Sequence, residues 1–120
     1  MTLLMLHATL ARAVMIYALI LGLWGLVRYA RGEGLDGSYL GAVVIAEVLI
    51  LVQAGSGIVL WLQGLSPSRL IHILYGIVTV ISFPATFAFT HGEAGRREML
   101  YWGLIGLFVF GLAIRAQMVA

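Results

Sequence analysis

The chain has 120 residues, of which 62 % are hydrophobic and only 10 % are charged, and it contains no cysteine. A soluble domain carries roughly 25 % charged residues, so this composition predicts an integral membrane protein. The missing thiols exclude disulfides, cysteine metal sites and covalent haem attachment. The net charge of +2 comes from seven arginines and five acids and gives no indication of nucleic-acid binding.

Four apolar stretches follow one another along the chain, separated by charged and glycine-rich segments. A bilayer core about 30 Å thick needs about 20 apolar residues per helix. The stretches therefore predict transmembrane helices over residues 7–28, 39–63, 68–90 and 98–117. The connections are short and rich in turn-forming residues, which favours antiparallel neighbours. We expect one all-α domain over residues 1–120, an integral membrane four-helix bundle with up-down-up-down topology.

The ends of the predicted helices carry capping residues and aromatic side chains. Ser38 is a candidate N-cap for the second helix, Gly64 suits its end, and residues 66–68 offer a capping hydroxyl and a proline for the third. Aromatic rings near helix ends are typical anchors at the level of the lipid headgroups. That interpretation applies to five residues: Tyr29, Tyr39, Trp61, Tyr101 and Trp102.

The distribution of arginines predicts an orientation in the membrane. The first and third connections and their flanks hold four arginines: Arg28, Arg31, Arg96 and Arg97. The opposite side holds Arg69 alone, once Arg12 and Arg115 are set aside because they lie inside apolar stretches. Because positive loops stay in the cytoplasm, we expect these two connections to be cytoplasmic and both termini to lie outside, in a bacterial cytoplasmic membrane.

Small and polar residues in the spans indicate where helices meet. One stripe of the second helix is predicted to face other helices: Ala42, Ala46, Gln53, Ser56 and Gly57. Close backbone approach is also expected at four glycines of the first and fourth helices: Gly22, Gly25, Gly103 and Gly106. In the third helix, Pro84 removes one backbone hydrogen bond and predicts a kink.

Glu47 is a carboxyl group close to the predicted membrane centre. It lies eight residues into the second helix, about 12 Å from that helix's start at 1.5 Å per residue. Ionisable residues at such depth are costly and often functional, so Glu47 is a candidate contact for a proton or a quinone. The alternative is a neutral carboxyl hydrogen-bonded to a neighbouring helix.

Two histidines on one side of the membrane are candidate haem ligands. His72 begins the third helix, and Gly76 lies one turn further on the same face, so this face suits a flat macrocycle that needs an imidazole ligand and room for the ring edge. His7 begins the first helix at a similar depth and is the candidate second ligand. His91 is nineteen residues, or about 28 Å, away from His72 and cannot share that site. The alternative for each is an ordinary interfacial histidine.

Three arginines lie on the same side as these histidines. Arg12, Arg69 and Arg115 would neutralise haem propionates or bind an anionic lipid. The alternative is that the long side chains reach the lipid phosphates, which costs little so close to an interface.

The segment Arg69-Leu70-Ile71-His72-Ile73-Leu74-Tyr75-Gly76 has the pattern R-x-x-H-x-x-Y-G. With this pattern the chain resembles, over most of its length, a class of small uncharacterised bacterial four-helix membrane proteins. That resemblance brings no known activity. More loosely, the chain resembles b-type cytochrome bundles, which implies non-covalent haem b, an axial ligand at His72 and electron transfer near quinones. Tyr75 and Gly76 of the same segment are further candidate cofactor-binding residues. The chain departs from that pattern because it lacks two well-buried histidines on facing helices, so ligation by His72 alone stays open.

Other chemistry has little support in the sequence. There is no phosphate-binding glycine loop, no His-Glu-x-x-His and no serine elbow, which argues against a hydrolytic enzyme. We therefore expect a haem-binding electron-transfer protein in the lipid bilayer. Its expected partners are a membrane redox complex, a quinone or further copies of itself. The rival hypothesis is a non-catalytic accessory subunit of a larger respiratory or photosynthetic complex. Small-solute transport ranks third, because no pair of broken helices is present.

Overall fold

The computed structural model describes residues 2–65 and 69–119, and within them the chain forms four α-helices. These are α1 (Leu3–Ala30), α2 (Gly37–Leu62), α3 (Ile71–Thr90) and α4 (Arg96–Met118). By length and composition, each of the four could cross a membrane. The predicted helical class and the four candidate spans are therefore confirmed.

The first helix begins four residues earlier than predicted. Thr2 is its N-cap, and the Thr2 hydroxyl accepts a hydrogen bond from the backbone N–H of Met5 at 3.1 Å. A side-chain oxygen at this position satisfies one of the N–H groups that a helix start leaves open. His7 consequently lies in the second turn of α1 and not at its first residue.

The ends of α2 follow local capping chemistry. Asp36, and not Ser38, is the N-cap, because Asp36 Oδ1 accepts a hydrogen bond from the N–H of Tyr39 at 2.8 Å. Gly64 has a φ of +88°, a conformation open to glycine, and follows the end of the helix as predicted. The predicted cap and the predicted start of the third helix fall on residues 66–68, outside the described residues.

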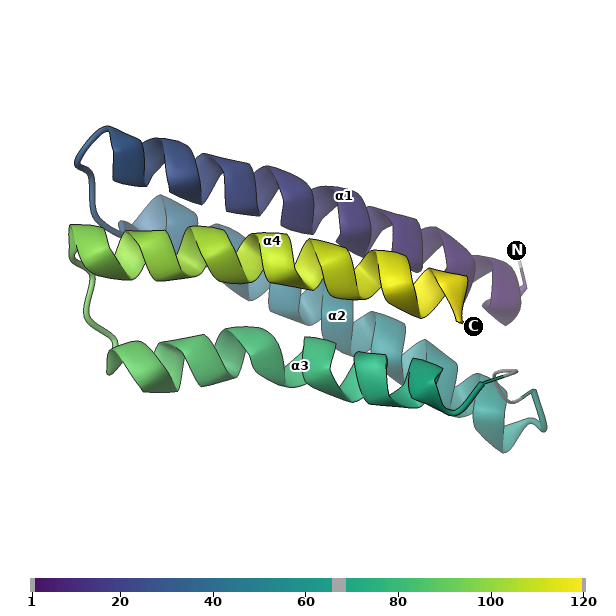
Figure 1. Ribbon diagram of the computed structural model, residues 1–120. Helices are drawn as coiled ribbons and strands as arrows, with labels where there is room; N and C mark the ends of the chain where they lie inside the picture. Colours follow the sequence, from purple (N-terminus) through teal and green to yellow (C-terminus); the bar gives the residue numbers. More distant parts are fainter. Residues whose placement is uncertain (1, 66–68, 120) are drawn as a thin grey trace.

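The four helices form a bundle in which α1 lies diagonally opposite α3, and α2 lies diagonally opposite α4 (Figure 1). The two helices of each diagonal pair make no direct backbone contact. The first and last helices, α1 and α4, pack most closely, whereas α2 and α3 make the fewest contacts of the four adjacent pairs. Figure 1 shows both termini at one end, here called the terminal end. The connections from α1 to α2 and from α3 to α4 lie at the other, here called the loop end.

Glycines bring the backbones of α1 and α4 together. A Cβ atom added to Gly106 would lie 2.7 Å from the Cα of Gly22, and one added to Gly25 would lie 2.7 Å from the Cα of Gly103. Real Cβ contacts do not reach such distances. The close approach predicted for these four glycines is therefore confirmed.

Two aromatic residues predicted as interface anchors belong instead to the core. Tyr39 and Trp102 are both fully buried. The Tyr39 hydroxyl donates to the carbonyl of Leu21 at 2.7 Å, and the Trp102 ring stacks on Phe83 with 6.3 Å between ring centres. The interface interpretation is wrong for these two, because the position of a residue near a helix end does not determine which way its side chain points.

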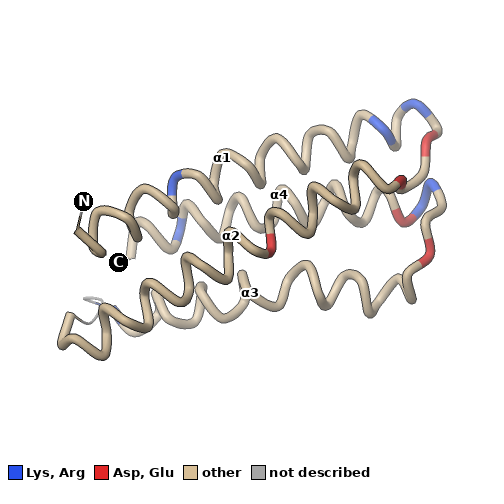
Figure 2. The backbone as a smooth tube through the Cα atoms, turned by 180° about the vertical axis from the view of Figure 1, so that it is seen from behind, with Lys and Arg blue, Asp and Glu red and all other residues tan. Residues whose placement is uncertain are grey.

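Charged groups cluster at the loop end (Figure 2). Arg28 forms ion pairs with Glu33 at 3.0 Å and with Asp36 at 3.3 Å. The two connections also bond directly, since the N–H of Leu35 donates to the carbonyl of Ala94 at 3.0 Å. Ion pairs thus hold the first connection against the end of α1, and a backbone hydrogen bond joins the two connections.

Candidate functional site

His7 of α1 and His72 of α3 lie close together at the terminal end. Their ring centres are 6.3 Å apart, and the ring planes make an angle of 71°. The two residues belong to helices that face each other across a diagonal of the bundle. The structure therefore brings the two sequence-predicted iron ligands to one place, and both rings are partly buried.

Each imidazole is held by its Nδ1 atom. His72 Nδ1 lies 2.7 Å from the carbonyl oxygen of Ala116, and His7 Nδ1 lies 3.1 Å from the carbonyl oxygen of Gln53 and 2.8 Å from Ser56 Oγ. A carbonyl only accepts, and the Ser56 hydroxyl spends its own hydrogen on the Gln53 carbonyl at 2.7 Å. Nδ1 is therefore the donor in both rings, which leaves a lone pair on each Nε2 when the imidazoles are neutral.

Glycine makes room for the His7 ring. A Cβ atom on Gly57 would lie 2.9 Å from His7 Cε1, so a larger residue here would require the ring to shift away from α2. Gly76, one turn after His72, has open space, with no described atom within 4 Å of an added Cβ. Tyr75 beside it is partly buried, and its carbonyl accepts a hydrogen bond from Thr79.

The three predicted arginines remain on the surface of the terminal half. Arg12, Arg69 and Arg115 are exposed, and Figure 2 shows basic positions of α1 and α4 towards the terminal end. Arg115 directly precedes Ala116, whose carbonyl holds His72. All ion pairs among the described residues involve either Arg28 or Arg97 at the loop end, so the arginines near the histidines carry their charge without a carboxylate partner there.

Glu47 does not join the histidine pair. It lies about 15 Å along α2 from Gly37 and about 13 Å short of Ser56, at 1.5 Å per residue. Its Oε1 atom is buried and has no hydrogen-bond partner among the described residues. The alternative interpretation, a carboxyl hydrogen-bonded to a neighbouring helix, therefore finds no such bond at Oε1.

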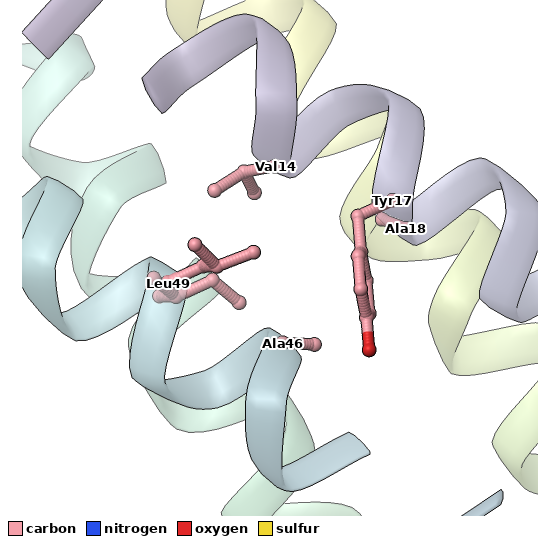
Figure 3. Close-up of a pocket in the computed structure, with 6 residues that line it drawn as sticks. Val14, Tyr17, Ala18, Ala46 and Leu49 are labelled. Carbon is pink, nitrogen blue, oxygen red and sulfur yellow. The ribbon is translucent and has the colours of Figure 1, made fainter. Parts of the chain in front are cut away.

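A hollow between α1 and α2 lies beside the core (Figure 3). Val14, Tyr17 and Leu49 are among its lining residues, and it has no room for a water molecule. The Tyr17 hydroxyl donates to the carbonyl of Ala42 at 2.6 Å and so is already satisfied. The hollow is a packing gap and offers no ligand site.

Three residues that contact the two histidines were not predicted as site residues from the sequence: Ser56, Gly57 and Ala116. The small and polar stripe of α2 was predicted to face other helices, and its Ser56 and Gly57 lie at the same end as His7. Because Ser56 and Gly57 lie at the same depth as His7, the sequence could have predicted that they contact it. Ala116 acts only through its backbone carbonyl, which no side-chain pattern reveals.

The two histidines share one hydrogen-bonding feature with histidines that bind metals. Ligating histidines usually donate their second ring N–H to a carbonyl or a similar acceptor, as His7 and His72 do here. Among residues 2–65 and 69–119, no group of three or more histidines, cysteines or acids could hold a metal ion. The comparisons with known proteins add no family to this description: no family model, curated protein or solved structure matches the chain.

Proposed function

We propose that this chain crosses a bilayer four times, in alternating directions, and binds one non-covalent haem b between His7 and His72 for electron transfer. The observation that carries the proposal is the spacing of the two rings. A histidine nitrogen binds a metal at about 2 Å and the ring centre lies about 1 Å further out, so two imidazoles on opposite sides of one metal have centres about 6 Å apart. The observed separation is 6.3 Å.

Haem fits this donor set better than a bare metal ion. Structural zinc sites take four protein ligands, whereas the pair supplies only two. A haem iron already has four porphyrin nitrogens and needs one or two axial ligands from the protein. The open space at Gly76 and the sparse contact between α2 and α3 favour a flat group that reaches the pair from that side.

Other residues of the terminal half have supporting roles in this proposal. Arg12, Arg69 and Arg115 neutralise the propionates, and Tyr75 contacts the macrocycle. Ser56 and the Ala116 carbonyl keep hydrogen on each Nδ1, which orients both rings. The bound haem supplies one-electron oxidation and reduction. With the loop end in the cytoplasm, the haem lies towards the outer face of a bacterial membrane.

Visible absorption of the protein purified in mild detergent, before and after dithionite, tests this proposal. We expect a Soret band and reducible α and β bands, lost in His72→Ala. Loss of one axial ligand in His7→Ala should convert the spectrum from six-coordinate to five-coordinate. The matched control is His91→Ala, which removes a histidine at the loop end and should leave the spectrum unchanged.

A featureless spectrum after titration with added haem, in protein that circular dichroism shows to be folded, would refute haem binding. Bands that persist in the double variant of His7 and His72 would refute the assignment of the ligands. If haem is not bound and the chain purifies only with larger membrane subunits, the accessory-subunit hypothesis replaces this one.

A further inference from the structure

A cavity of about 330 Å³ lies at the loop end, between the end of α3 and the first two turns of α4. Its lining includes two aromatic rings, two carboxylates, one guanidinium and one hydroxyl: Phe89, Tyr101, Glu93, Glu98, Arg97 and Thr90. Ligand sites in proteins have volumes from about 300 Å³ upward, so this cavity has room for a small polar group. It lies at the opposite end of the bundle from the histidine pair.

The carboxylate of Glu98 is fixed at the wall of this cavity. Glu98 Oε1 accepts a hydrogen bond from the N–H of Gly95 at 3.1 Å, and Glu98 Oε2 accepts one from Arg97 Nε at 3.1 Å. A Cβ atom added to Gly95 would lie 2.6 Å from Glu98 Oε1, so the carboxylate lies directly against the backbone. Only 8 % of the Glu98 side chain is exposed. The charge of Glu98 is thus compensated within the chain.

Glu93 supplies a second carboxylate, which lacks this compensation. All ion pairs among the described residues involve other carboxylates, so Glu93 has no such partner there. Two carboxylates and one guanidinium leave the lining with an excess of one negative charge when His91, which also lines the cavity, is counted as neutral. Because opposite charges attract, the cavity favours a ligand that places a cationic group beside Glu93.

The hydrogen-bonding groups of the lining narrow the choice of cation. The Thr90 hydroxyl donates to the carbonyls of Thr86 at 3.0 Å and Phe87 at 3.1 Å, so only its lone pairs remain for a ligand. The carboxylates of Glu93 and Glu98 also only accept. These acceptors need a cation that carries hydrogens on its nitrogen. A primary ammonium does so, whereas a quaternary ammonium has none to donate.

Arg97 supplies the opposite charge at the same cavity. Its Nε–H is used on Glu98, but its two terminal nitrogens donate no hydrogen bond within the described part of the chain. The Arg97 side chain is mostly exposed, so these N–H groups are open to a ligand. A guanidinium binds phosphate oxygens strongly and in a defined geometry. The cavity therefore matches a group that carries a primary ammonium and a phosphate close together.

The surface next to the cavity is apolar, which favours a ligand with hydrocarbon chains. The rings of Phe89 and Tyr101 pack edge to face, with 5.6 Å between their centres. Leu104 and Phe108 follow Tyr101 by three and seven residues, so they share its face of α4, and both are exposed. This apolar strip continues from the cavity along the helix axis, the direction in which acyl chains lie beside a membrane-spanning helix.

We propose that the loop-end cavity binds the headgroup of a phospholipid with a primary amine, of the phosphatidylethanolamine class. The ammonium donates to Glu93, Glu98 and Thr90, the phosphate accepts from Arg97, and the acyl chains follow the apolar strip of α4. This inference rests on the bilayer crossing proposed above. It is independent of haem binding, because the cavity and the histidine pair share no residue.

Native mass spectrometry of the purified chain in detergent, with added lipids of identical acyl chains, measures this preference. Phosphatidylethanolamine should bind at least about tenfold more tightly than phosphatidylcholine, because hydrogen bonds to charged groups are lost with the N–H donors. Singly and doubly methylated headgroups should fall in between. Glu93→Gln removes the charge of an exposed side chain and should abolish most of the preference. The matched control Glu33→Gln makes the same change at the loop end, outside the cavity, and should retain it.

Equal binding of the two lipids, or an unchanged preference in Glu93→Gln, would overturn the proposal. Water-soluble glycerophosphoethanolamine separates the two sources of this headgroup and should compete far more weakly than the lipid. If it binds as tightly as the lipid, the cavity belongs to a soluble ligand and the lipid assignment is wrong. Resistance to extraction from membranes by alkaline carbonate tests the bilayer crossing separately, so lost lipid preference in a resistant chain counts against the headgroup site alone.

Discussion

The glycine contact between α1 and α4 allows a quantitative test of the packing. In Gly106→Ala, the new Cβ would lie 2.7 Å from the Cα and 2.8 Å from the N of Gly22, both of them backbone atoms. Ordinary contact begins at 3.4 Å, so the two helices must separate by about 0.7 Å at this point. No side chain can move aside to accommodate the methyl group.

The cost of this separation follows from general packing energetics. Adding a methyl group to a filled interior costs about 1 to 3 kcal/mol, and the separation also weakens the dispersion contacts along the seam. We expect Gly106→Ala to lower the free energy of unfolding by about 2 kcal/mol, or about thirtyfold in the unfolding equilibrium. Unfolding in mixed micelles of increasing SDS content, followed by circular dichroism, measures this quantity.

Gly111 provides the matched control on the same helix. An added Cβ at Gly111 meets no described atom within 4 Å. Gly111→Ala should leave the stability unchanged or raise it by up to about 1 kcal/mol, because alanine loses less backbone entropy than glycine on folding. Equal stability of Gly106→Ala and the native chain would refute the close approach of α1 and α4.

Three further substitutions test other contacts. Tyr39→Phe removes a buried hydrogen bond to a carbonyl of α1 and should cost about 1 to 2 kcal/mol in the same unfolding assay. Gly57→Ala should displace the His7 ring and weaken haem binding at least tenfold in a titration, whereas Gly55→Ala, which meets no described atom, should not. Asp36→Ala removes both a helix cap and a partner of an arginine, so it should cost about 1 kcal/mol, and salt should reduce the difference.

The four helices could be predicted from composition because hydropathy and turn residues act locally. The exact helix ends depended on which polar side chain captures a free N–H, and sequence alone did not distinguish Asp36 from Ser38 at the start of α2. The glycines of α1 and α4 also carried a readable signal, since small residues at helical spacing permit close approach.

The direction of side chains was harder to predict. Tyr39 and Trp102 stand near helix ends in the sequence, and only the packing of α1 and α3 against them places them inside the core. The grouping of His7 with His72 was predicted from depth alone. The orientation of both rings depends on hydrogen bonds to the backbone carbonyls of Gln53 and Ala116. Every residue has a backbone carbonyl, so the sequence does not indicate which ones bind a side chain.

The tightest seam of the bundle joins the first helix to the last, and this has a consequence for biosynthesis. A ribosome makes α1 long before α4, so the glycines of α1 remain without their partners until α4 has also been made. During that time α1 is held only by its weaker contact with α2. Synthesis of α4 is therefore the step that completes the bundle, and a chain interrupted after Thr90 would leave the glycines of α1 uncovered.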